Sequence, residues 1–462
     1  MAAPEPLSIL EAATAIKGGK LTAVDLTRQC LDRIARLDGD LCTFVTVTAG
    51  RALAAAARAD EEIAAGKCRG PLHGIPIALK DVIDVANVRS TACSKLLLDN
   101  VPEHNSNAWA RLEQAGAVLL GKLTTHEFAI GGPSFDLPFP PARNPWDRTR
   151  FTGGSSSGSG AAVAAGLVPG ALGTDSGGSI RTPASYCGIV GMKPTYGLVG
   201  RSGVVPLSTS LDHVGPMTRT VADNAMMLNV IAGYDPSDAT SANRPPEDVT
   251  AQLDEGVRGL RIGYAEEFDD AAGVSDEVRA GIQDALRTLE GLGARIETAA
   301  LPSLEDMTDC ARLILMAESF AVHQRTMQGR AGDYGEVVRG RLMLGGLVSA
   351  ADYIAAVRLR RELAVRMGEA TALFDVIITA GTARPAPKLE AAPKFALMVK
   401  PPLVFPFNLT GAPAMTMPCG FSETGLPLSL QIAGKPFQEA MVYRVAQAYE
   451  DATEWHRRWP HE

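Results

Sequence analysis

Residues 153–159, GGSSSGS, and 173–181, GTDSGGSIR, are two stretches rich in serine and glycine. Glycine lets backbone N–H groups turn toward a ligand at little steric cost. Serine supplies hydroxyl groups that can attack a substrate or relay a proton. Upstream, the apolar run at residues 75–80, IPIALK, ends in a lysine. The three stretches together predict a nucleophilic serine site in which Lys80 is the base and no histidine is needed.

These stretches resemble the motifs of the amidase signature hydrolases. That family has a lysine after an apolar strand, then GGSS, then GTDxGGSIRxPA, and this chain has GIPIALKD, GGSSSGSGAA and GTDSGGSIRTPA with fitting spacings. The likeness continues through four more segments, YCGIVGMKPT, SLDHVGP, FNLTG and LPLSLQ, at residues 186–195, 210–216, 407–411 and 426–431. It covers most of the chain and is weakest between about residues 265 and 373.

The resemblance implies a role for each member of a Ser-Ser-Lys triad. Ser179 is the expected nucleophile, which attacks the amide carbonyl and forms an acyl-enzyme. Ser155, which follows a cis peptide bond after Gly154, is expected to relay a proton between Ser179 and Lys80. The apolar residues before Lys80 predict burial, which lowers the pKa of a lysine and makes its neutral form available as a base.

The residues around the triad have expected supporting roles. The oxyanion hole is expected to consist of the backbone N–H groups that lead up to and include the nucleophile, those of Ser176, Gly177, Gly178 and Ser179. Ser156 is expected to donate an orienting hydrogen bond. Asp175 and Arg181 are interpreted as scaffolding charges that form a pair.

Simpler interpretations compete with each of these assignments. A lone serine in a glycine-rich loop usually caps a turn or a helix, and only the joint match of three motifs favours catalysis. A Ser-His-Asp triad with His213 stays open, because triad members lie far apart in sequence. The chain has no H-x-H, H-E-x-x-H, S-x-x-K or P-loop motif. We therefore expect no metal and no cofactor.

The segment at residues 127–141, EFAIGGPSFDLPFPP, is predicted to border the acyl pocket. Phe128, Ala129 and Ile130 are the candidate pocket residues. Phe128, Phe135 and Phe139 form an apolar wall in one interpretation and are ordinary core aromatics in the other. The apolar wall would favour an uncharged acyl or amine group.

Composition limits the partners and the compartment. The chain has 462 residues and a net charge of −8, which argues against a nucleic-acid partner. No apolar stretch approaches the roughly 18 residues that span a bilayer, and residues 1–6 lack the features of a secretory signal. Seven cysteines without a C-x-x-C pair suit free thiols. We expect a cytoplasmic enzyme that acts on a small-molecule amide, and the sequence leaves a homodimer open.

Strands that alternate with helices predict an α/β fold. The resemblance implies a single-domain α/β/α sandwich over residues 1–462, with a large mixed central sheet, a signature core at about 70–220 and a variable helical region at about 304–372. Helices are predicted at 23–37, 51–65, 107–114, 161–165, 276–292 and 438–452. Strands are predicted at 75–79, 117–120, 260–264, 294–297, 375–379, 413–418 and 426–432.

The predicted function is hydrolysis of the C–N bond of a neutral aryl or alkyl amide through a serine acyl-enzyme. One alternative is the glutamine-hydrolysing subunit of a tRNA-dependent amidotransferase, which shares all these motifs. A second is an ester or carbamate hydrolase that uses the same acyl-enzyme chemistry, and a third is a non-catalytic scaffold that has kept the fold.

Overall fold

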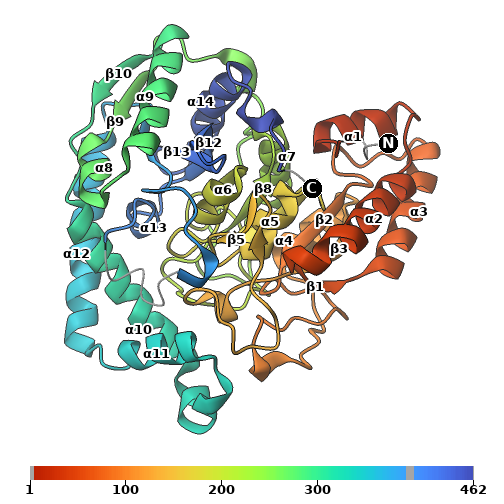
Figure 1. The fold of residues 1–462 in the computed structure, drawn as a ribbon, viewed down its shortest axis with the longest axis horizontal. Coiled ribbons are helices and arrows are strands. Elements are labelled where there is room, and N and C mark those ends of the chain that lie inside the picture. The colour runs from red at the N-terminus through yellow and green to blue at the C-terminus, as the bar shows by residue number, and fades with distance from the viewer. Residues whose placement is uncertain (1–4, 392–399, 461–462) are drawn as a thin grey trace.

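A computed structural model describes residues 5–391 and 400–460, and its main feature is one sheet of 11 strands (Figure 1). In spatial order the strands are β1 (Phe44–Val47), β3 (Val118–Leu123), β2 (Pro76–Lys80), β6 (Gly170–Thr174), β8 (Val214–Thr218), β7 (Val190–Lys193), β12 (Ala414–Phe421), β13 (Pro427–Ala433), β11 (Val376–Ala380), β9 (Arg261–Tyr264) and β10 (Arg295–Thr298). A separate hairpin pairs β4 (Arg143–Asn144) with β5 (Asp147–Phe151).

The sheet is mixed, as the resemblance implies. Strand β2 pairs in parallel with both β3 and β6, and β9 pairs in parallel with both β10 and β11. Between these two parallel groups, β6, β8, β7, β12, β13 and β11 form antiparallel pairs. The order of the strands along the chain therefore differs from their order in space, and segments far apart in sequence become neighbours.

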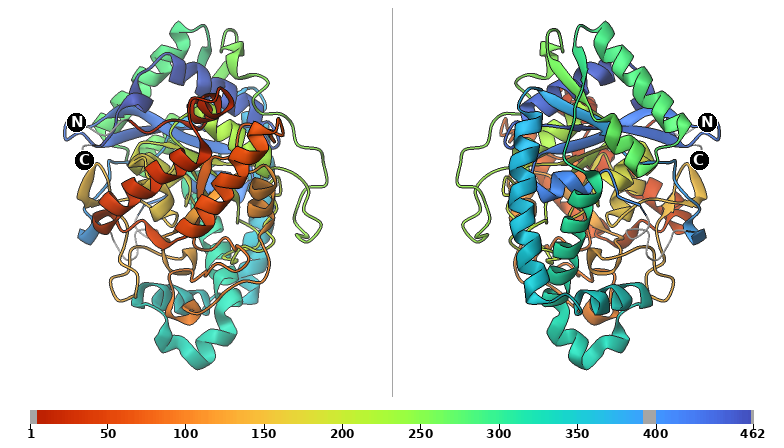
Figure 2. Two further views of the ribbon diagram at one scale, coloured as in Figure 1. Left: turned by 90° about the vertical axis from the view of Figure 1, so that its right-hand side faces the viewer. Right: turned by 90° about the vertical axis from the view of Figure 1, so that its left-hand side faces the viewer.

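Helices cover both faces of the sheet, which gives the predicted α/β/α arrangement (Figures 1 and 2). Their bounds are α1 (Ile9–Lys17), α2 (Ala23–Leu41), α3 (Ala49–Ala64), α4 (Asn107–Gln114), α5 (Ser157–Ala164), α6 (Arg181–Cys187), α7 (Val221–Ile231), α8 (Glu266–Ala272), α9 (Asp276–Gly291), α10 (Leu304–Arg330), α11 (Glu336–Gly345), α12 (Ala350–Thr371), α13 (Phe405–Leu409) and α14 (Glu439–Asp451). The predicted helical region at 304–372 is therefore three helices, α10 to α12, which lie along the left and lower side of Figure 1.

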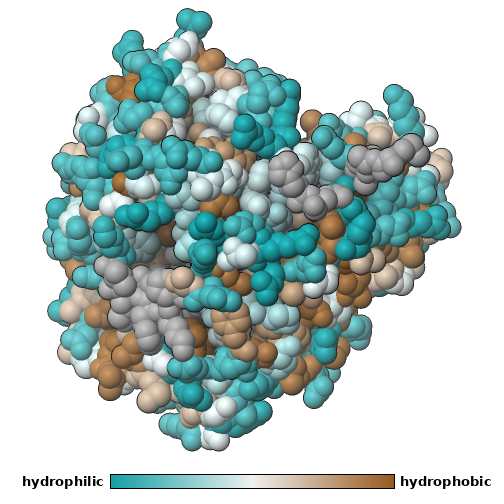
Figure 3. Space-filling model, viewed as in Figure 1, coloured by the Kyte–Doolittle hydropathy of each residue, from teal (hydrophilic) through white to brown (hydrophobic). Residues whose placement is uncertain are grey.

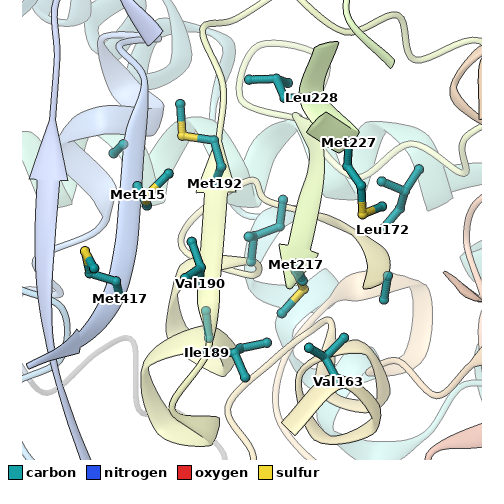
Figure 4. Close-up of a cluster of buried hydrophobic side chains, with 14 of the residues drawn as sticks. Val163, Leu172, Ile189, Val190, Met192, Met217, Met227, Leu228, Met415 and Met417 are labelled. Atoms are coloured by element: carbon teal, nitrogen blue, oxygen red, sulfur yellow. The ribbon is translucent and has the colours of Figure 1, made fainter. Parts of the chain in front are cut away.

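The interior beside the central strands is filled by methionine and aliphatic side chains (Figure 4). Met192 on β7, Met217 on β8 and Met415 on β12 are fully buried and lie around neighbouring strands. Methionine is unbranched and fills irregular gaps, which suits strands rich in glycine that offer little side-chain volume of their own. This packing fixes β6, β7 and β8 in the middle of the molecule.

All seven cysteines are free thiols, as predicted. The face shown in Figure 3 is mostly hydrophilic, with hydrophobic residues in small groups. Across the described ranges no single helix is both long and apolar enough to cross a membrane, although α11 and α12, bent by 89° at their junction, reach that length and composition as a pair.

Candidate active site

The candidate site begins where two parallel strands end side by side. Ile77 of β2 pairs with Gly170 of β6, and Leu79 pairs with Leu172. In this register the carboxyl ends of β2 and β6 lie at the same edge of the sheet, and they carry Lys80 and the second serine-rich loop. Ligands of α/β sheets commonly bind at this edge.

Lys80 lies in the centre of a buried hydrogen-bonded group. Its Nζ is 2.7 Å from Ser155 Oγ and 2.7 Å from Thr174 Oγ1. The lysine side chain is fully buried. Burial lowers its pKa to about 7, although the negative charge of Asp175 acts to raise it. Neutral lysine is therefore well populated near neutral pH, which is the condition the sequence predicts for a base at this position.

Ser156 joins the two serine-rich loops. Its backbone N–H donates to the carbonyl oxygen of Ser179 at 3.2 Å, and its hydroxyl donates to the carbonyl oxygen of Thr174 at 3.2 Å. The peptide bond between Gly154 and Ser155 is cis, as the resemblance implies. The structure thus brings together all three sequence motifs. Ser179 lines the adjoining cavity, whereas Lys80 and Ser155 are buried and are not among its described lining residues.

The loop before Ser179 exposes only some of its backbone N–H groups. Ser176 and Gly177 line the cavity together with Ser179, and none of their three N–H groups donates to another described residue. Gly178 differs from the prediction, because its N–H donates to Asp175 Oδ1 at 2.7 Å. The close approach of Phe405 explains the glycine at 177, since a Cβ there would lie 2.0 Å from the ring.

Asp175 and Arg181 form the predicted pair, fully buried behind the loop. Arg181 Nε and Nη2 each donate to the Asp175 carboxylate at 3.1 Å. Arg181 also donates to Gln431 at 2.7 Å and to Asn408 at 2.5 Å. Burial acts to raise the pKa of Asp175, but the charge and hydrogen bonds of Arg181 outweigh it and hold that pKa well below its usual range. The pair is a fixed ionic support and not an acid–base couple.

The alternative histidine makes no hydrogen bond to Ser179. His213 Nδ1 lies 2.6 Å from the carbonyl oxygen of Leu211 and 3.1 Å from that of Asp175. No described residue other than these contacts its ring nitrogens through a hydrogen bond. The geometry therefore offers no Ser-His-Asp triad at this loop.

The predicted pocket residues divide between the cavity and the core. Ala129 and Ile130 line the cavity, whereas Phe128 packs against His323 and Tyr334, with ring centroids 4.6 and 5.7 Å away. Of the other two phenylalanines in this segment, Phe135 is exposed to solvent and Phe139 lines a separate small cavity. The predicted wall of phenylalanines is thus absent from the described lining of the main cavity.

The main cavity has a volume of about 710 Å³ and opens over Ser179. One wall comes from the variable helical region, where Arg312, Leu315, Met316 and Ser319 of α10 recur at helical spacing, and Arg341 and Leu344 come from α11. The resemblance marks residues 304–372 as variable, but the sequence could not show which of them reach the pocket.

Comparison with known proteins identifies the family. The model of the Amidase family matches residues 25–443. This chain belongs to the amidase family. Its relatives include the A subunits of two glutamyl-tRNA(Gln) amidotransferases. The subunit of Trichlorobacter lovleyi is 40% identical over 96% of this chain and 97% of its own length. The subunit of Chloroflexus aurantiacus is 41% identical over 98% of both chains. Two solved structures resemble it closely. One is a peptide amidase in complex with the inhibitor chymostatin, with a TM-score of 0.86 and 31% identity over 98% of this chain and 99% of that chain. The other is an inhibitor-bound vestigial protein complex that bears on the origins of an s-triazine catabolic enzyme, with a TM-score of 0.91 and 31% identity over 96% of this chain and 98% of that chain.

Membership of the amidase family makes the chain a hydrolase that acts on C–N amide bonds. The sequence analysis did not single out several residues that form hydrogen bonds at this site. Thr174, Asn408 and Gln431 all lie within the motifs quoted above, but their contacts with Lys80 and Arg181 depend on strand order and helix placement. Asp212, which accepts a hydrogen bond from the Ser176 hydroxyl, also lies in a quoted motif.

Proposed function

We propose that this amidase hydrolyses a small-molecule amide through an acyl-enzyme on Ser179. The observation that supports the proposal is the buried contact of 2.7 Å between Lys80 Nζ and Ser155 Oγ, on a loop whose next residue, Ser156, hydrogen-bonds to the cavity-lining Ser179. Serine is a weak nucleophile unless a base takes its proton. A lysine whose pKa is about 7 is such a base at physiological pH.

In the proposed mechanism, neutral Lys80 accepts the proton of Ser155, which in turn takes the proton of Ser179. Ser179 Oγ then forms a bond to the amide carbon, and the N–H groups of Ser176, Gly177 and Ser179 stabilise the oxyanion. The C–N bond breaks as the relay returns the proton to the leaving nitrogen. Water hydrolyses the resulting ester by the same relay, which releases the acid and restores Ser179.

The pH dependence of the reaction follows from the pKa of Lys80. Protonated lysine cannot accept a proton, so kcat/KM should fall about tenfold for each pH unit below about 7 and level off above it. Initial rates at low substrate concentration, measured from pH 5 to pH 9, check this. A profile that stays flat down to pH 5 would exclude Lys80 as the base.

More than one class of substrate is a candidate for this site. The expectation of a neutral aryl or alkyl amide rests on phenylalanines that do not line the described cavity. The second candidate function is the glutamine-hydrolysing subunit of an amidotransferase, and the full-length identity of about 40% to proteins of that name favours it. Ester and carbamate cleavage share the same acyl-enzyme.

Two experiments test the proposed function. A fluorophosphonate probe should label the wild-type protein at Ser179, and a panel of aryl amides, alkyl amides, carbamates and glutamine should contain at least one substrate. Absence of both labelling and turnover would favour the non-catalytic scaffold. Stable co-purification of further subunits, together with ammonia release from glutamine above all other amides, would favour the role in an amidotransferase.

A further inference from the structure

Most of the charged side chains around the main cavity are cationic. Five cations line it: Arg150, Arg312, Arg341, Arg384 and Lys400. The first three are half-buried, and the last two are exposed to solvent. Among the described lining residues the only acid is Glu277, which is also exposed. The described lining therefore carries an excess of positive charge, although the whole chain has a net charge of −8.

Neighbouring acids neutralise these cations only in part. Arg150 Nε forms an ion pair with Asp147 Oδ2 at 3.3 Å, and both side chains are partly exposed. Arg312 Nη1 donates to Asp309 at 2.9 Å, but the Asp309 side chain is 73% exposed, and an ion pair with so exposed a carboxylate is weak. The Nε of Arg312 is buried without an acceptor among the described residues. Arg384 and Lys400 form no ion pair within the described part of the chain.

The walls around these charges strengthen their effect. Leu315, Met316 and Leu344 line the same cavity, and apolar walls of low dielectric focus the field of nearby charges. Burial lowers the pKa of Arg341 only to about 10, so its guanidinium stays charged at neutral pH. A ligand with a negative charge is therefore attracted into this cavity, and one with an ammonium group is repelled.

We propose that the cavity selects amides that carry a carboxylate, and that Arg312 on α10 is one of the groups that bind it. The proposal rests on the proposed amidase function and names the substrate class of the same site. A guanidinium can donate two parallel hydrogen bonds to a carboxylate. The selected class is an amide with an acidic group and an apolar connecting chain, which differs from both a neutral amide and a zwitterionic amino acid.

Three amides of similar length separate these classes. Glutaramate (4-carbamoylbutanoate) carries a carboxylate, pentanamide carries no charge, and glutamine carries a carboxylate and an ammonium group. We expect kcat/KM for glutaramate to exceed that for pentanamide by about tenfold, and to exceed that for glutamine as well. Raising the ionic strength should reduce this preference. If pentanamide or glutamine is the better substrate, the proposed selectivity is wrong.

Arg312→Gln tests the assigned residue. It removes the charge, and Asp309 can remain solvated because it is exposed. We expect this variant to reduce kcat/KM for glutaramate about tenfold more than kcat/KM for pentanamide. Arg325→Gln is the matched control, since Arg325 lies on the same helix and is exposed away from the described cavity lining. Equal losses for the two substrates in Arg312→Gln would overturn the assignment.

A binding measurement keeps this inference separate from the proposed function. Calorimetry on Ser179→Ala with glutaramate, pentanamide and glutamine reports charge selectivity without any turnover. Tighter binding of glutaramate supports the inference, and equal or weaker binding overturns it. Fluorophosphonate labelling of the wild type decides the acyl-enzyme mechanism independently, so a failure of either proposal is recognisable.

Discussion

Ser179→Ala is expected to reduce kcat by at least about a thousandfold, because removal of a catalytic serine leaves only binding and oxyanion stabilisation. The fold should survive the change. Ser179 lines the cavity and its hydroxyl donates to no described residue, while Asp175 holds the loop by accepting from the backbone N–H groups of Gly178 and Ile180. Steady-state turnover of the best amide in the panel measures the effect, and the thermal midpoint measures the stability.

Ser157→Ala provides the matched control for this variant. Ser157 belongs to the first serine-rich stretch, but its hydroxyl donates to the carbonyl oxygen of Thr124 at 3.3 Å and it is not among the described residues that line the main cavity. Turnover of Ser157→Ala should stay within about threefold of the wild type. Comparable turnover by Ser179→Ala and by Ser157→Ala would eliminate Ser179 as the nucleophile.

The local chemistry of the site could be predicted because the residues that carry it lie in short contiguous motifs. The apolar run that ends in Lys80 contains strand β2 (Pro76–Lys80), and each of the five residues of this strand is buried. The helix predicted at residues 107–114 is α4, residue for residue, between Ser106 as N-cap and Gly116. In contrast, the helix predicted at 161–165 begins at Ser157, because burial of a serine- and glycine-rich turn outweighs the low helix propensity of those residues.

Features that depend on long-range packing could not be predicted from the sequence. Strands β6 and β8, GALGT and VGPMT, lack the alternating β-branched pattern of a strand, and pairing with each other and with their other neighbours decides their structure. Two of the hydrogen-bond partners of Arg181, Asn408 and Gln431, lie more than 200 residues away along the chain. Periodicity predicted helices at 304–372, but which face of α10 meets the cavity depends on how the helix packs. The cationic lining was not predicted, because Arg150, Arg312 and Lys400 lie far apart in the sequence and meet only in the folded chain.

Lys80→Met should reduce kcat/KM by about a hundredfold to ten-thousandfold, the range typical for loss of a general base. Methionine is close to lysine in length and carries no charge. Lys80 is fully buried, and burial already favours its neutral form, so an apolar replacement of similar size should fit. The residual activity should also lose its decline below pH 7, because the group that gains the proton is gone. A pH series with the variant and the wild type measures both effects.

Lys193→Met distinguishes loss of the base from loss of a buried lysine in general. Lys193 is also fully buried, burial lowers its pKa well below the usual value, and its Nζ donates to the carbonyl oxygen of Pro194 at 2.9 Å. It lies outside the described lining of the cavity, so its replacement removes one hydrogen bond and no member of the proposed proton relay. We expect activity within about threefold of the wild type and an unchanged decline below pH 7. If Lys80→Met resembled Lys193→Met in rate and in pH profile, another group would have to accept the proton of Ser155, and the Ser-Ser-Lys mechanism would be untenable.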